Sequence, residues 1–333
     1  MRRIALAFAL ALGSAGAALA QTPAQGVASP LATPSNVAPP TAPPPPLPPR
    51  TDGVPADMAF GAYQRGNFLY ALLEAERRLD ANHKDAAAMT LIGEIYRDGA
   101  AVARSDQEAS RWFRLASNLG DPDAAYELGA MLVQGGNGVA KDPAAAKAQV
   151  ERAAAKDHPG ALYNLGVMAL QGLGGKRPDY NLAAQYFLRA ADAGDDDAAY
   201  SYGVMLRDGK GAPQDIGEAA HWLKRAADDG IIAGQVEYAI MLFNGVGVDR
   251  NETEAAKIFQ KAAARANPIA QNRLAHLYVG GRGVPRDLVQ AALWHSFAKA
   301  AGLADPELDR ATANLTPEQM TQVRALILRQ TEF

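Results

Sequence analysis

The 333-residue sequence contains no cysteine, which excludes disulfides, iron–sulfur clusters, zinc–thiolate sites and cysteine nucleophiles. It also lacks an excess of charge of either sign, because 33 lysines and arginines stand against 36 aspartates and glutamates. A chain so close to neutral gives no reason to expect nucleic-acid binding. One compact domain of this length would be unusually large, so several domains or a repeat array are expected.

The N-terminus has the pattern of an export signal. Residues 1–3, Met-Arg-Arg, give a short positive start, and residues 4–20 carry no charge and end in Ala-Leu-Ala. Small residues stand at the two positions that a signal peptidase reads, so we expect cleavage after Ala20. The product would be periplasmic or secreted and would not be an integral membrane protein. The alternative is an uncleaved anchor, for which seventeen residues rich in alanine and glycine are marginal.

Residues 21–57 form a segment of different composition, with 12 of the chain's 21 prolines and only three charges. Such a segment cannot bury a core and favours the extended polyproline II conformation. We interpret it as a disordered linker that spaces the folded part from another structure. The alternative is a ligand for a proline-binding module, to which Pro43-x-x-Pro46 corresponds loosely.

One sequence phrase recurs from residue 86 onward with a period of 36 or 37 residues. It contains a Leu-Gly-like pair whose small residue is Gly93, Gly129, Gly166, Gly203, Ala239 or Ala275. Six residues later follows a glycine: Gly99, Gly135, Gly172, Gly209, Gly245 or Gly281. A cap-type residue comes next: Ser105, Asp142, Asp179, Asp215, Asn251 or Asp287. All three tryptophans of the chain stand seven residues after such a cap: Trp112, Trp222 and Trp294. This self-similarity indicates an array of small structural units.

Each unit has the pattern of two helices. Ala125, Leu128, Gly129 and Leu132 stand at i, i+3, i+4 and i+7, which places them on one face of a helix. A glycine in mid-helix costs about 1 kcal/mol, so its recurrence indicates that another helix packs closely there. Gly135 and its equivalents are expected to end the first helix, and the cap residue to begin the second. Stacked hairpins of this kind form an α-solenoid.

These motifs resemble the Sel-1-like repeat family, a branch of the tetratricopeptide superfamily. Residues 270–302 match most closely, and six units cover 86–305. Residues 58–85 resemble a tetratricopeptide-type hairpin that precedes them, and 306–333 are expected to form C-terminal capping helices. The predicted fold is therefore an all-α solenoid of helical hairpins. The resemblance implies an adaptor for protein complexes, and the absence of cysteine separates this chain from the disulfide-stapled members.

The sequence contains no recognisable catalytic, cofactor or metal constellation. The recurrent aspartates Asp142, Asp179, Asp215 and Asp287 are interpreted as helix caps rather than as general acids or bases. The acidic runs 195–197 and 228–229 lie in expected inter-repeat turns, where solvated side chains are favoured over a cation site. The five histidines share no repeat position and form no paired metal spacing.

A stripe beside the buried face of each first helix is the candidate site. In one unit it consists of Tyr126, Ala130 and Val133, which should face the inner curve of the solenoid. The same stripe in the other units supplies further candidates. The candidate partner-binding residues are Tyr126, Tyr163, Leu170, Tyr200, Arg207, Phe243 and His276. Tyrosine among apolar neighbours is typical of a protein- or peptide-binding groove. The alternative is that tight curvature buries the stripe as core between repeats.

The expected function is that of an exported, non-enzymatic scaffold that mediates protein–protein interactions in a bacterial-type cell envelope. It needs no cofactor, and its partner is a protein or peptide rather than a nucleic acid. Two alternatives stay open on the same fold: a cell-wall-associated hydrolase, and a protein that binds glycan or peptidoglycan through the tyrosines.

Overall fold

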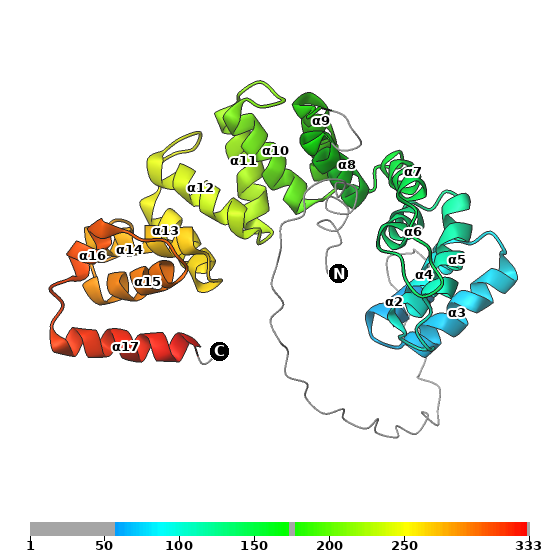
Figure 1. The fold of residues 1–333 in the computed structure, drawn as a ribbon, viewed down its shortest axis with the longest axis horizontal. Coiled ribbons are helices and arrows are strands. Elements are labelled where there is room, and N and C mark those ends of the chain that lie inside the picture. The colour runs from blue at the N-terminus through cyan, green and yellow to red at the C-terminus, as the bar shows by residue number, and fades with distance from the viewer. Residues whose placement is uncertain (1–56, 173–176, 332–333) are drawn as a thin grey trace, which may run out of the picture. The chain divides into compact units, whose positions relative to one another are not determined.

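The fold consists of helices throughout the residues that the structure, a computed structural model, describes: 57–172 and 177–331. Sixteen α-helices and no strand occur in these ranges (Figure 1). The predicted all-α solenoid of helical hairpins is therefore confirmed. No helix in the described ranges has the length and apolar character needed to cross a membrane. The predicted signal peptide and all of the predicted linker except Asp57 lie outside the described residues.

Hairpins follow one another along the chain. An N-terminal pair consists of α2 (Met58–Gln64) and α3 (Phe68–Ala81). The two helices of the six repeats are α4 (Ala86–Asp98) and α5 (Asp106–Asn118), α6 (Pro122–Gln134) and α7 (Pro143–Ala154), α8 (Pro159–Gln171) and α9 (Tyr180–Asp192), α10 (Asp196–Asp208) and α11 (Ile216–Asp228), α12 (Ile232–Asn244) and α13 (Glu252–Ala264), and α14 (Pro268–Gly280) and α15 (Leu288–Ala300). The chain then forms α16 (Pro306–Thr312) and α17 (Pro317–Thr331).

The helices belong to two compact units, and each has its own core. The first unit extends to Met168, and the second contains the end of α8 and the chain from Arg177 onward. In the first unit, apolar side chains of α2, α3 and α4 form one buried cluster that includes Leu72 and Ile92. In the second, a cluster extends from α11 to α16 and includes Phe259. Alanines fill most of the remaining buried positions, which allows helices to approach closely.

The second helix of every repeat begins at the residue predicted to cap it. All six predicted residues are N-caps whose side-chain oxygen accepts a backbone N–H of the first turn: Ser105, Asp142, Asp179, Asp215, Asn251 and Asp287. Donor–acceptor distances are 2.9–3.2 Å. These side chains satisfy N–H groups that have no partner within the helix. The recurrent aspartates are thus structural, as predicted.

Glycines in the middle of first helices mark close helix contacts, as their recurrence predicts. A Cβ atom on Gly203 of α10 would lie 2.9 Å from Leu223 Cγ of α11. A Cβ on Gly93 of α4 would lie 2.7 Å from Phe113 Cε1 of α5. Helix α10 ends at Gly209, whose φ of 66° and ψ of 29° place it in the left-handed region that glycine adopts without strain.

The C-terminal helix α17 packs against α15 of the last repeat. Its start is a reciprocal capping box, in which Thr316 Oγ1 accepts from Gln319 N and Gln319 Oε1 accepts from Thr316 N. On α17 the side chain of Val323 is buried, whereas Met320 in the first turn is 38% exposed.

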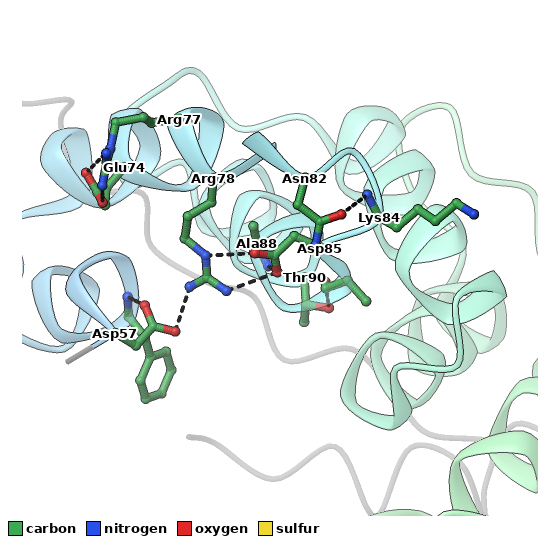
Figure 2. Close-up of polar contacts among 11 residues, drawn as sticks. Asp57, Glu74, Arg77, Arg78, Asn82, Lys84, Asp85, Ala88 and Thr90 are labelled. Atoms are coloured by element: carbon green, nitrogen blue, oxygen red, sulfur yellow. Dashed lines mark hydrogen bonds and ion pairs between the residues drawn. The ribbon is translucent and has the colours of Figure 1, made fainter. Parts of the chain in front are cut away.

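Arg78 joins the N-terminal hairpin to the first repeat, and the sequence pattern did not indicate it. Its guanidinium group lies between two helix-capping aspartates (Figure 2). Nη1 is 2.7 Å from Asp57, the N-cap of α2, and Nε is 2.9 Å from Asp85, the N-cap of α4. Nη2 donates to the second Asp85 oxygen at 3.0 Å, so that contact is bidentate. One side chain therefore holds two helix starts together.

Replacing Arg78 should loosen this junction. Arg78→Met keeps an aliphatic side chain and removes the guanidinium group. We expect it to cost about 1–3 kcal/mol of local stability, because two aspartates lose a charged partner. Hydrogen exchange should accelerate in α2 and α3 and stay unchanged in α10–α15. Arg77→Met is the matched control, since Arg77 pairs only with Glu74 at the surface of the same helix. Equal acceleration in both variants would contradict the assigned role.

Candidate functional site

The candidate stripe in the first unit is partly core. Ala130 and Val133 of α6 are 2% and 5% exposed. At these two positions the stripe is core, as the alternative of burial between repeats predicts. Tyr126, which precedes Ala130 by four residues in the same helix, is half-buried. Its ring stacks on His158, with ring centroids 4.4 Å apart and an interplanar angle of 22°.

The stacked pair of Tyr126 and His158 belongs to a small polar cluster. His158 Nδ1 accepts from Ala161 N at 3.1 Å and so caps α8, while Nε2 lies 3.3 Å from Asp123 Oδ1. The hydrogen bond from His158 holds the pKa of Asp123 below its usual range. Tyr163, on α8, is likewise half-buried. Both candidate tyrosines of this unit, Tyr126 and Tyr163, therefore combine packing with partial exposure.

The candidates in the second unit have diverse surroundings. Leu170, near the end of α8, is 36% exposed. Tyr200 of α10 is half-buried against the core, and burial raises the pKa of its hydroxyl group. Arg207 donates from Nε to Asp208 at 2.8 Å and from Nη1 to Glu237 at 2.5 Å. The arginine thus links α10 to α12 of the next repeat.

An ion pair between the first helices of successive repeats occurs in each unit at the same position. In the first unit Arg97 Nη1 lies 2.6 Å from Glu127 Oε2. In the second, Arg207 and Glu237 form the corresponding pair, also separated by 30 residues. The repeat pattern did not predict this pairing. Its signal is present, however, as an Arg at the end of one first helix and a Glu in the next.

Acidic groups gather around Arg97. Burial is the main cause that raises the pKa of Glu94 to about 7, and the nearby carboxylates of Glu127 and Asp98 act in the same direction. Arg97 opposes this shift. Tyr63 of α2 donates from its hydroxyl to Asp98 at 2.8 Å, and burial raises the pKa of Tyr63. Glu94 and Arg97 of the first repeat correspond to Ala130 and Val133. The start of the stripe is therefore an ionic cluster rather than an apolar groove.

The remaining candidates, Phe243 and His276, border a cleft of about 530 Å³ in the second unit. Its apolar wall consists of side chains from α12, α13 and α14: Ile240, Phe243, Phe259, Leu277 and Val279. Basic and acidic side chains also line it: Arg273, His276, Arg282 and Glu307. Arg282 Cζ lies 4.0 Å from the centroid of the Phe243 ring. His276 Nε2 is 2.7 Å from Asp305 Oδ2, which anchors the imidazole to the start of α16.

These arrangements offer surface to a binding partner, and among the described residues they do not bring a set of catalytic side chains together. Two of the seven candidate residues, Phe243 and His276, meet at one cleft, and the other five are distributed over three helices, α6, α8 and α10. In the described ranges no group of three or more histidine, aspartate or glutamate side chains has the spacing to hold a metal ion. Partner binding by the seven residues stays a prediction.

Comparison with known proteins gives one family and several solved structures. The family model described as "Sel1 repeat" matches residues 86–121, 122–158, 159–195, 196–231, 232–267 and 268–303. No curated protein matches. The structure of c5321, a protective antigen of uropathogenic Escherichia coli strains with an SLR fold, is 29% identical with a TM-score of 0.59. That alignment covers 73% of this chain and 56% of c5321, so this chain spans little more than half of that protein.

A second solved structure is similar over nearly its whole length. It is a Sel1 repeat protein from Oxalobacter formigenes, 27% identical with a TM-score of 0.60. The alignment covers 73% of this chain and 98% of that one. Each matched segment corresponds to one observed hairpin, which confirms the resemblance drawn from the loop glycines and caps.

The raised pKa of Glu94 predicts a pH-dependent stability. Between about pH 4.5 and 7 the unfolded chain releases the Glu94 proton while the folded chain retains it, so stability falls as pH rises. Glu94→Gln removes this titration. We expect its stability advantage over the wild type to grow by about 1–2 kcal/mol between pH 4.5 and 8, as measured by urea unfolding. Glu76→Gln, an exposed glutamate of the same unit, is the control, and a pH-independent difference for Glu94→Gln would contradict the prediction.

Proposed function

This chain belongs to the Sel1 repeat family, and on that premise we propose that it is a non-enzymatic scaffold that binds a protein or peptide partner through its first helices. Repeats of this family generally build scaffolds for protein–protein interactions. The observation that carries the proposal for this chain is the cleft at Phe243 and His276. It combines an apolar wall with exposed cationic side chains on one accessible surface.

The composition of the cleft is that of a recognition surface. Aromatic residues and arginine are enriched where proteins bind one another, since they bury a large area and keep a polar edge. Phe243 supplies the aromatic ring, and Arg273 and Arg282 supply the arginines. A volume of about 530 Å³ accommodates a few side chains of a peptide. The half-buried Tyr163 and Tyr200 add contact area in their respective units.

We further propose that the protein acts in the cell envelope after export. The support is the charged start at residues 1–3, the uncharged run at 4–20 and the small residues that end at Ala20. The proline-rich segment that follows would separate the repeats from the envelope component that holds them. Mass spectrometry of the protein from the producing cell tests the export step, because processing after Ala20 leaves Gln21 as the first residue. A mature protein that begins at Met1 would contradict it.

A hydrolase is the second candidate, and Glu94 is the observation that favours it. A carboxyl group with a pKa near 7 can donate a proton at neutral pH. Against this candidate, Glu94 lies beside Arg97 in the packed start of the stripe and is not among the residues that line the cleft. Glycan binding by the tyrosines is the third candidate and rests on the same surface as the scaffold proposal.

Affinity capture with a tyrosine variant separates these candidates. The mature chain serves as bait in envelope extract, beside Tyr163→Ala/Tyr200→Ala and the control Tyr180→Ala. Tyr180 is 46% exposed on α9 and lies outside the stripe. We expect a partner protein to be retained by the wild type and by Tyr180→Ala and reduced several-fold with the double variant, because lost aromatic contacts at an interface weaken binding.

The melting temperatures of the three proteins decide how a loss of capture is interpreted. An unchanged value for the double variant supports a binding surface. A decrease of more than about 5 °C, which corresponds to more than 1–2 kcal/mol for a chain of this size, assigns the tyrosines to the core instead. Capture of no protein by the wild type would contradict the scaffold proposal and favour glycan binding or hydrolysis.

A further inference from the structure

The two positions that form the ion pairs Arg97–Glu127 and Arg207–Glu237 carry different residues at the cleft. Counting in the repeat period, Arg97 and Arg207 correspond to Phe243, while Glu127 and Glu237 correspond to Arg273. The separation is again 30 residues. The arginine has thus become a phenylalanine and the glutamate an arginine, so a cation stands where the other two pairs have an anion.

Arg273 is left without a partner by this exchange. It is exposed on α14, and among the described residues it makes no hydrogen bond or ion pair. The other basic side chains of the cleft already have partners. Arg282 pairs with Glu252 at 2.6 Å while it lies over Phe243, and His276 contacts Asp305. Arg273 is therefore the cation of this cleft that is available to a ligand.

The surroundings of Arg273 define the ligand further. Ile240, Leu277 and Val279 give the cleft an apolar wall that an anion alone would leave exposed. Glu307 of α16 also lines the cleft, and its side-chain oxygens can accept N–H donors. A carboxylate, an adjacent apolar side chain and backbone N–H groups together are properties of a peptide segment.

We infer that this cleft binds a segment of a partner protein in which an aspartate or glutamate stands next to a large apolar side chain. The inference rests on the proposed function and specifies the chemistry of the partner. The Arg273 guanidinium would hold the carboxylate through two parallel N–H donors. The apolar side chain would pack on Val279 and Ile240, beside the Phe243 ring. Charge complementarity thus favours an acidic segment over a neutral or basic one.

A random peptide library provides the test. Octapeptides flanked by Gly-Ser and displayed on phage are selected on the immobilised mature chain, and enriched peptides are then measured individually by fluorescence anisotropy. We expect enriched sequences to place Asp or Glu beside Leu, Ile, Met or Phe. Arg273→Gln should weaken their binding at least tenfold, Arg273→Lys should weaken it less, and higher salt should weaken binding to the wild type.

Arg286→Gln is the matched control, because Arg286 is an exposed arginine of the same unit outside the cleft. It removes the same charge and should change the affinity less than twofold. Arg273→Glu adds a second test, since it should select basic peptides in place of acidic ones. Melting temperatures establish that each variant is folded.

Three outcomes would overturn the inference, and they differ in what they say of the proposed function. Enriched peptides without acidic residues, or with affinities insensitive to Arg273, overturn the acidic-segment inference and leave the scaffold proposal standing. Self-association of the chain that Arg273→Gln abolishes assigns the cleft to a second copy. If no peptide is enriched on the wild type, peptide binding by the cleft is contradicted. The proposed function then loses the support of the cleft and is decided by the affinity capture.

Discussion

The close packing of the two helices in each repeat is the contact on which the rest of the structure depends. At Gly203 the backbone of α10 comes so near Leu223 that a methyl group would have to displace it. Helices this close exclude water from both apolar faces, and the buried alanines permit the same approach elsewhere. A single hairpin cannot cover its own outer faces, so stability comes from neighbouring repeats. The helical pairs at the two ends supply that cover for the first and last repeats.

This packing decides which side chains are left for function. Ala130 and Val133 are used by the core, although they belong to the stripe that sequence periodicity places next to the buried face. What stays accessible is set by the residues that vary from one repeat to the next. Three environments result: the ionic cluster around Arg97, the stacked Tyr126 and His158, and the cleft beside Phe243. The scaffold is periodic, but its surface chemistry is not.

Charged residues at one repeated position show how such a surface diverges. Arg97 and Glu127 satisfy one another between neighbouring first helices, as do Arg207 and Glu237. Paired charges of this kind hold register and offer little to a ligand. Where these positions hold Phe243 and Arg273, the same geometry presents an aromatic ring and a cation that makes no ion pair with the described residues. Two different residues at these positions therefore give a surface with an aromatic ring and a cation in place of a structural contact, without any change in the fold.

The sequence by itself determined the repeat length, the helix boundaries and the fold class, because these follow from short-range chemistry. The caps Asp142 and Asp215 act on backbone groups three residues away, and Gly209 supplies a backbone conformation within one turn. The tertiary structure alone decided which stripe residues are buried and which cations are paired. Arg78 lies between Asp57 and Asp85, and Arg273 makes no ion pair within the part of the chain that the structure describes. Both arrangements depend on the angle and spacing between helices. Periodicity shows which face of a helix a residue occupies, but what lies opposite that face follows only from packing.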